Sequence, residues 1–263
     1  GYNSFPKTLP TGAVPTQKVA YAYDYDFDYQ IKQTLKGAGY SEIYTYSLVS
    51  EDQLKKLNIN PGKTLRIDNP ISKEYEYLRP TLIGNLLAAL GQNQANFNKI
   101  DLYELGKQYS GETCDKAIET YWLWAITSGE EFYQAKGVVQ TVLSQFSPDY
   151  QIRPATKDDN HYWLHPGRTA QIETSKKEYL GVIGEVHPSL LAKYDIKGSA
   201  TVWAINIDLL KQRVGQQNIY RPIPKYPPVI EDISLVLPNG VLIGEVVNLI
   251  KNNHLVASVE LID

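Results

Sequence analysis

The sequence contains no methionine and only one cysteine, Cys114, among its 263 residues. A single cysteine cannot form an internal disulfide, which fits the reducing environment of the cytoplasm. No apolar run approaches the roughly 20 residues that a membrane-spanning helix needs. Because the chain also begins with Gly1 and not with methionine, we expect a fragment of a longer cytoplasmic protein that has no membrane partner.

The sequence also lacks a strong charge of either sign and the common nucleotide-binding motifs. Its net charge is −3 and its pI is about 5.9, so any contact with nucleic acid would have to use a local patch. Neither a P-loop nor a G-x-G-x-x-G motif is present. No pair of carboxylates is marked for acid–base work, and the surroundings of Cys114 do not indicate a nucleophile. We therefore assign no catalytic residue.

An acidic segment near the N-terminus resembles the start of a calcium-binding loop. Asp24, Asp26 and Asp28 alternate with aromatic residues. A calcium loop needs glycine after the third ligand and glutamate at the twelfth position, where Tyr29 and Leu35 stand. We therefore interpret the segment as the start of a helix that Asp28 caps.

Two histidines have the spacing of metal ligands on a helix. His161 and His165 are four residues apart, but Tyr162, Trp163 and Pro166 around them favour strand and turn. The spacing loses its meaning outside a helix. We expect partly buried imidazoles that bond to the backbone, and we assign no metal-binding residue.

Hydrophobic periodicity predicts helices and strands that do not alternate strictly. A hydrophobic content of 43% is enough for one large domain or two unequal ones. The expected strands are 41–49, 100–109, 121–127, 168–173, 179–186 and 200–207. Besides the helix at Asp28, helices are expected to begin at Ser50, Thr81, Phe132 and Pro188. This order favours an antiparallel α+β architecture over a doubly wound sheet.

Residues 64–109 carry the clearest local pattern. Thr81 can cap a helix whose apolar residues, among them Leu82 and Leu86, recur three to four positions apart. We expect that helix to pack on the sheet. In the strand that follows, Gly106 would let another group approach closely.

Five short blocks resemble the β subunit of bacterial-type phenylalanine–tRNA ligase. The family patterns N-P-[IL]-S, L-R-x-[ST]-L-[IL]-x-x-L-L and [FY]-E-[IL]-G stand here in order as Asn69–Ser72, Leu78–Leu87 and Tyr103–Gly106. Two later patterns, H-P-G-[RK]-[ST]-A and G-x-[LIV]-H-P, correspond to His165–Ala170 and Gly184–Pro188. The signature residues to which we give a structural role are Asn69, Pro70, Arg79, Glu104, Gly106, His165, Pro166, Arg168, Gly184, Glu185, His187 and Pro188.

The resemblance implies a fold class and a division into domains. Residues 22–210 would form a class II aminoacyl-tRNA synthetase-like α+β domain, an antiparallel sheet with flanking helices, preceded by a lead-in at 1–21. A proline-rich linker at 211–228 would lead to 229–263, the first half of a ferredoxin-like anticodon-binding domain. The elements expected in that half are a strand at 229–237, a helix at 242–251 and a strand at 255–262.

The resemblance also bears on catalysis. Related catalytic subunits carry G-[RK]-x-[YF]-R, whose arginine holds the ATP α-phosphate, but Gly106–Ser110 ends in serine. Those subunits also have a later glycine-rich strand that ends in arginine. When residues 204–211 are aligned with that strand, Asn206 and Asp208 stand at the positions of small glycines, and Lys211 stands at the position of the arginine. Lysine does not substitute for a planar guanidinium, and a buried Asp208 carboxylate would repel a triphosphate. We therefore expect no catalysis.

The implied function is that of a non-catalytic structural part of the ligase β subunit. In the family this part packs on the catalytic α subunit in an α2β2 assembly, and the terminal domain contacts tRNA. The whole enzyme uses ATP and magnesium to charge tRNA with phenylalanine, but we expect no cofactor in this fragment. Glu231 stands where the family pattern [FY]-P-x-x-x-R-D has arginine, which removes a positive charge. Two alternatives remain open: an independently active adenylating enzyme and a stand-alone RNA-binding module.

Overall fold

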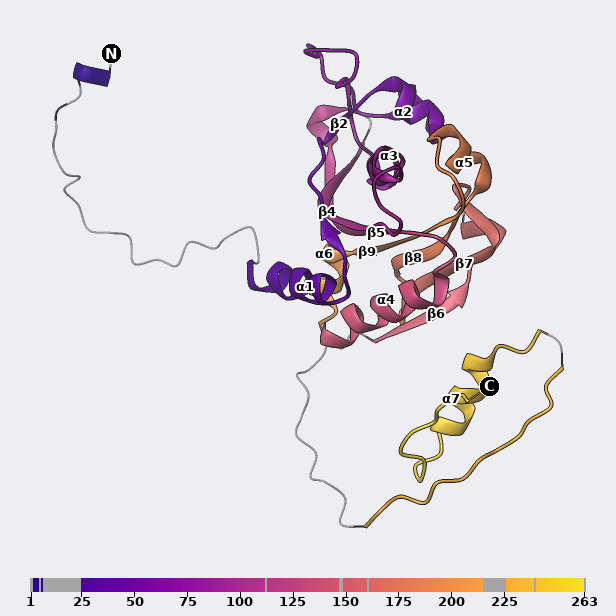
Figure 1. The fold of residues 1–263 in the computed structure, drawn as a ribbon. Helices are drawn as coiled ribbons and strands as arrows, with labels where there is room; N and C mark the ends of the chain where they lie inside the picture. The colour runs from indigo at the N-terminus through magenta and orange to yellow at the C-terminus, as the bar shows by residue number, and fades with distance from the viewer. Residues whose placement is uncertain are drawn as a thin grey trace. The chain divides into compact units, whose positions relative to one another are not determined.

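Figure 1 shows the computed structural model of the chain, which describes residues 2–4, 6, 25–111, 113–146, 149–159, 161–214, 226–238 and 240–262. The chain divides into two compact units, Gly1–Asn218 and Ile219–Asp263. Most of the predicted lead-in and linker lies outside the described residues. Within the described ranges, no helix combines the length and the apolar composition that crossing a bilayer requires.

The first unit is built on a seven-stranded sheet with the strand order β1-β4-β5-β9-β8-β7-β6. Its strands are β1 (Ser41–Glu42), β4 (Asp101–Ser110), β5 (Ile118–Ser128), β6 (Tyr150–Pro154), β7 (Leu164–Thr174), β8 (Tyr179–Val186) and β9 (Ala200–Asn206). Every neighbouring pair is antiparallel except β1 and β4. The expectation of a mainly antiparallel sheet is confirmed. A separate antiparallel pair is formed by β2 (Leu48–Val49) and β3 (Tyr77–Leu78).

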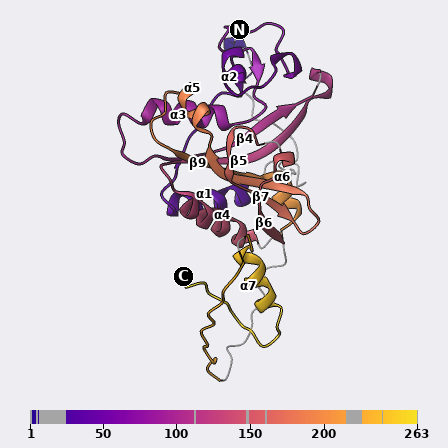
Figure 2. The ribbon, with the colours of Figure 1, turned by 90° about the vertical axis from the view of Figure 1, so that its right-hand side faces the viewer.

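Helices cover both faces of this sheet (Figures 1 and 2). On one face α1 (Tyr25–Gly37) and α4 (Phe132–Phe146) bury a core that includes Tyr103, Leu105 and Trp203. On the other face α3 (Ile83–Asn93) and α5 (Pro188–Lys193) share a second core with strand residues. The remaining elements are α2 (Glu51–Lys56), α6 (Ile207–Gln212), η1 (Tyr2–Ser4), η2 (Pro61–Lys63), η3 (Cys114–Lys116) and η4 (Lys157–Asp159).

Alternation along the strands produces the two cores. Successive strand residues point to opposite faces, so Leu123 of β5 enters the α1/α4 core while Trp122 and Trp124 pack under α3. Each fully buried leucine in such a core contributes about 1.5–3 kcal/mol. The sheet therefore holds its helices by hydrophobic burial on both sides.

The predicted helix starts are confirmed to different degrees. The predicted helix from Phe132 coincides with α4, and Ser50 caps α2 by accepting a hydrogen bond from Gln53 N. At α3 the cap position is Leu82, and Thr81 Oγ1 accepts only a long bond of 3.4 Å from Ile83 N. The hydroxyl of Thr81 thus assists the helix start from one residue further out than expected.

Two secondary-structure expectations for the first unit are wrong, and one strand was not predicted. Asp28 does not cap α1, because the helix begins at Tyr25 and places this side chain in a buried position of the first turn. The single strand expected at 41–49 is two short strands, β1 and β2, and Thr45 between them bonds the Glu104 side chain of β4. Strand β6 was not predicted, because it is a five-residue edge strand that ends in proline.

The second unit contains the expected helix but not the expected strands. Helix α7 spans Ile243–Lys251, within one residue of the prediction. Residues 229–237 and 255–262 form no strand, and a strand needs a neighbour for its N–H and C=O groups. The described part of this unit offers no such neighbour, so the ferredoxin-like half is not confirmed.

Two glycines test the close packing of the sheet. A Cβ at Gly181 of β8 would lie 2.0 Å from the Ala204 carbonyl oxygen of β9, whereas a Cβ at Gly137 on α4 would meet nothing within 4 Å. We expect Gly181→Ala to lower the free energy of unfolding by roughly 3 kcal/mol or more. Gly137→Ala should raise it by about 0.5–1 kcal/mol, because glycine is unfavourable inside a helix. Urea unfolding of both variants is the measurement, and equal effects would contradict the packing.

Candidate functional site

The signature residues of the second and third blocks meet at a buried ion pair. Arg79 follows β3, Glu104 lies on β4, and their side chains are only 3% and 2% exposed. Arg79 Nη1 lies 2.8 Å from Glu104 Oε1. The pair sits on the α3 side of the sheet, against Leu82 at the start of that helix.

Further hydrogen bonds satisfy the two buried charges. Arg79 Nε donates to the Lys107 carbonyl at 3.0 Å. The Thr45 hydroxyl donates to Glu104 Oε2 at 2.6 Å and accepts from Arg79 Nη1 and from Asn85 Nδ2, each at 2.8 Å. A hydroxyl has one donor and two acceptor sites, so Thr45 is fully used. This matters because a buried ion pair stabilises only when its remaining polar atoms are also paired.

Gly106 makes room for this pair, as the sequence predicted. A Cβ at Gly106 would lie 2.4 Å from Arg79 Nη2 and 3.0 Å from a Leu82 methyl group. A side chain there would therefore displace the guanidinium. The group that Gly106 admits is Arg79, and the arrangement is enclosed protein structure without an open ligand position.

The signature residues of the two later blocks form a second cluster on β7, β8 and α5. Arg168 Nη1 donates to both carboxylate oxygens of Glu185, at 2.9 and 2.7 Å. Thr169 Oγ1 donates to the His165 carbonyl at 2.7 Å, and a Cβ at Gly184 would lie 2.7 Å from that hydroxyl oxygen. These contacts pin the β7–β8 pairing where its register shifts.

His187 and Pro188 begin α5. His187 Nδ1 accepts from Ser189 N at 3.2 Å, and Pro188 occupies the first helical position, where a missing N–H is tolerated. The His187 N–H donates to the Trp163 carbonyl. This histidine is therefore a helix cap.

The other signature residues join neither cluster by a hydrogen bond that the described residues show. Asn69 is exposed and Pro70 half-buried in the loop before β3. Pro166 lies on β7 between His165 and the turn-like Gly167, whose N–H donates to His165 Nδ1 at 3.2 Å. The expectation that the histidines bond to the backbone holds for His165.

Three of the four positions compared with catalytic motifs make side-chain contacts within the protein. Ser110 is exposed at the end of β4, and Asn206 caps α6 by accepting from Leu209 N at 3.0 Å. Asp208 is exposed and not buried as we expected, because α6 turns it outward to accept from Tyr121 N at 2.7 Å. Lys211 Nζ lies 3.5 Å from Asp28 Oδ1.

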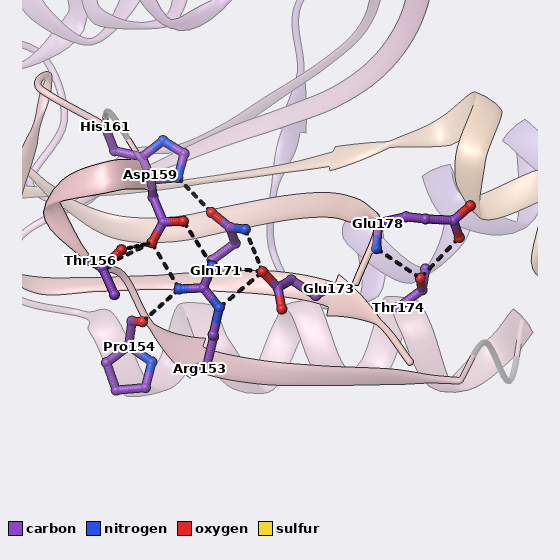
Figure 3. Close-up of polar contacts among 9 residues, drawn as sticks. All are labelled: Arg153, Pro154, Thr156, Asp159, His161, Gln171, Glu173, Thr174 and Glu178. Atoms are coloured by element: carbon purple, nitrogen blue, oxygen red, sulfur yellow. Dashed lines mark hydrogen bonds and ion pairs between the residues drawn. The ribbon is translucent and has the colours of Figure 1, made fainter. Parts of the chain in front are cut away.

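A further polar network on β6 and β7 was not predicted (Figure 3). Arg153 donates to both oxygens of Asp159 at 2.8 Å and to Glu173 Oε1 at 2.7 and 2.9 Å. Gln171 Nε2 also donates to Glu173, and its Oε1 lies 3.3 Å from His161 Nε2. The network ties Asp159 and His161, which lie between β6 and β7, to side chains of the sheet.

Arg153 shifts the pKa values of the two carboxyl groups in this network. Its hydrogen bonds hold the pKa of the Asp159 and Glu173 carboxyls below their ordinary values, and the two carboxylates raise the pKa of Arg153. Burial lowers the pKa of His161 below 6.5. No group here is positioned as a nucleophile, so we interpret the network as a latch for the loop.

The fold of the first unit is that of a class II aminoacyl-tRNA synthetase. The chain superposes on the crystal structure of pyrrolysyl-tRNA synthetase from Desulfitobacterium hafniense with a TM-score of 0.58. The similarity covers 71% of this chain and 67% of that chain, at 17% sequence identity. At that identity the likeness defines the fold.

The sequence comparisons define the family. The profile described as "Phenylalanyl tRNA synthetase beta chain CLM domain" matches residues 5–209, and the chain belongs to this family. Similar relatives are the phenylalanine–tRNA ligase β subunits of Carboxydothermus hydrogenoformans, 29% identical over 95% of this chain, and Geobacillus kaustophilus, 32% identical over 100%. The chain spans 33% and 34% of the length of these two proteins.

The buried pair gives a stability prediction. Arg79→Met should lower the free energy of unfolding by about 3–5 kcal/mol, because Glu104 would be left charged and buried. Lys107→Met is the control: Lys107 and its partner Glu119 are 53% and 50% exposed, and an exposed ion pair contributes little. Urea unfolding compares the two variants. A similar small effect for both would show that the Arg79 pair is not a stabilising element.

The latch gives a pH prediction. A carboxyl whose folded-state pKa is lowered stabilises the fold above its unfolded pKa of about 4 and loses that contribution as pH falls. The stability difference between the unaltered chain and Arg153→Met should therefore be largest above about pH 5 and shrink toward about pH 3. Urea unfolding at a series of pH values measures it. A difference independent of pH would contradict the assigned role of Asp159 and Glu173.

Proposed function

We propose that the chain is a non-catalytic structural part of a phenylalanine–tRNA ligase β subunit. In this proposal it supports the catalytic α subunit within an α2β2 assembly, in the cytoplasm, where tRNA is charged with phenylalanine at the expense of ATP. The observation that carries the proposal is family membership over residues 5–209. In addition, Asn206, Asp208 and Lys211, which stand at positions of catalytic motifs, make contacts within the protein.

The first support is the chemistry of the sheet face under α3. Trp122 and Trp124 pack there with the helix, and the polar centre of that face is the paired Arg79 and Glu104. Activation of an amino acid requires cations at the phosphates of ATP. Ser110 is the residue at the first of the expected cation positions, and it cannot supply a charge.

The second support concerns tRNA. We propose that residues 229–263 belong to a ferredoxin-like anticodon-binding domain of the whole subunit. Helix α7 lies at the expected place, and apolar residues on both sides of it, such as Val229 and Leu255, are exposed in this unit. Side chains of this kind are normally buried in a completed fold.

The proposal predicts no amino-acid activation by this chain alone. We expect no phenylalanine-dependent exchange of pyrophosphate into ATP, because the phosphate-binding cation is absent. The assembled α2β2 ligase serves as the active control. Phenylalanine-dependent exchange by the isolated chain would contradict the proposal and would favour an independent adenylating enzyme.

Assembly gives the complementary measurement. The chain should co-elute with the purified catalytic α subunit in size-exclusion chromatography. Separate elution at micromolar concentrations of both proteins would contradict a supporting role for this part of the β subunit.

A further inference from the structure

A hollow of about 310 Å³ opens on the described surface of the first unit, and the proposed function makes no use of it. Four parts of the sequence line it: residues 58–65 around η2, Pro80 after β3, residues 109–111 at the end of β4, and Tyr162 before β7. The polar and aromatic lining residues include Asn58, Asn60, Lys63, Tyr109, Ser110 and Tyr162.

The charge of the hollow is positive. Lys63 is the one residue of formal charge among the described residues that line it, and the contacts of the described residues include no ion pair for its Nζ. Lys193 lies beside the rim, where its Nζ donates to Asn58 Oδ1 at 3.1 Å and to the Lys56 carbonyl at 2.8 Å. Both of these acceptors are uncharged. The hollow therefore favours an anionic group.

One wall of the hollow is an aromatic ring held in place. Tyr162 is 43% exposed, and its ring meets the edge of Trp163 with centroids 4.7 Å apart. The same loop is fastened by Asp159 to Arg153 (Figure 3). The Tyr162 ring therefore offers an exposed flat face, and nearby contacts between Asp159 and Arg153 hold its segment to the sheet.

We propose that this hollow binds one nucleotide of single-stranded RNA, with the base on the Tyr162 ring and the phosphate at Lys63. The proposal rests on the proposed function, in which tRNA supplies such a strand. Stacking on an aromatic ring accepts any base and contributes about 1–3 kcal/mol. The exposed Ser110 hydroxyl at the end of β4 offers a further hydrogen bond to the sugar or phosphate.

The lining favours an RNA strand over free ATP. A triphosphate is normally bound with magnesium and carboxylate ligands, and the described lining residues include no carboxylate. The lining supplies one cation, Lys63, and Lys193 bonds the lining residue Asn58. Sites that bind single strands combine such cations with aromatic surfaces.

Fluorescence anisotropy of a labelled single-stranded RNA hexanucleotide, titrated with the chain, tests the proposal. Tyr162→Ala should weaken binding about tenfold through the loss of stacking. Lys63→Met should weaken binding and reduce the slope of log affinity against log salt by about one. Thermal unfolding of each variant checks that the fold is retained.

The controls are residues of the same type outside the hollow. Tyr133→Ala removes a tyrosine of α4 that is 84% exposed, and Lys36→Met removes an exposed lysine in the last turn of α1. Both variants should bind the hexanucleotide as the unaltered chain does. Absence of binding, equal losses in the controls, or displacement of the RNA by ATP at a comparable concentration would each overturn the proposal.

The two proposals fail in different ways. A chain that co-elutes with the α subunit, but whose RNA affinity is unchanged by Tyr162→Ala and Lys63→Met, refutes the hollow and leaves the proposed function intact. A chain that binds RNA through both residues, but does not join the α subunit, refutes the supporting role.

Discussion

The ion pair between Arg79 and Glu104 constrains the whole α3 side of the first unit. Two charges that are almost fully buried require every remaining polar atom to find a partner. Thr45 and the Lys107 carbonyl supply those partners, and Asn85 of α3 in turn donates to the Thr45 hydroxyl. The pair therefore fixes the loop after β1, the start of α3 and strand β4 relative to one another.

The same constraint fixes the polar groups on this face of the synthetase-like fold. A face that binds substrate must keep polar groups free, and here the polar groups are used by neighbouring side chains while Trp122 and Trp124 occupy the adjacent volume. The polar atoms that hold this face together are therefore already hydrogen-bonded within the protein.

Local signals in the sequence predicted much of this architecture. Helix α4 and the helix cap at Ser50 follow from periodicity and capping chemistry within a few residues. The latch at Arg153 could not be predicted, because it depends on the pairing of β6 with β7 and β6 is too short to give a pattern. The burial of Asp28 likewise depends on contacts with Tyr121 and Lys211, which are distant in the sequence. In both cases the sequence-based prediction failed because the structure depends on contacts between residues that are distant in the sequence.

The contact between Asp28 and Lys211 has a consequence for the order in which the chain can fold. It joins the first described helix of the unit to the last one, and Arg213 just beyond pairs with Glu178 of the β7–β8 turn. During synthesis, α1 must wait for nearly the whole unit to leave the ribosome before these partners exist. Such long-range closure slows folding, because the entropy of closing the intervening chain must be lost before the contact forms.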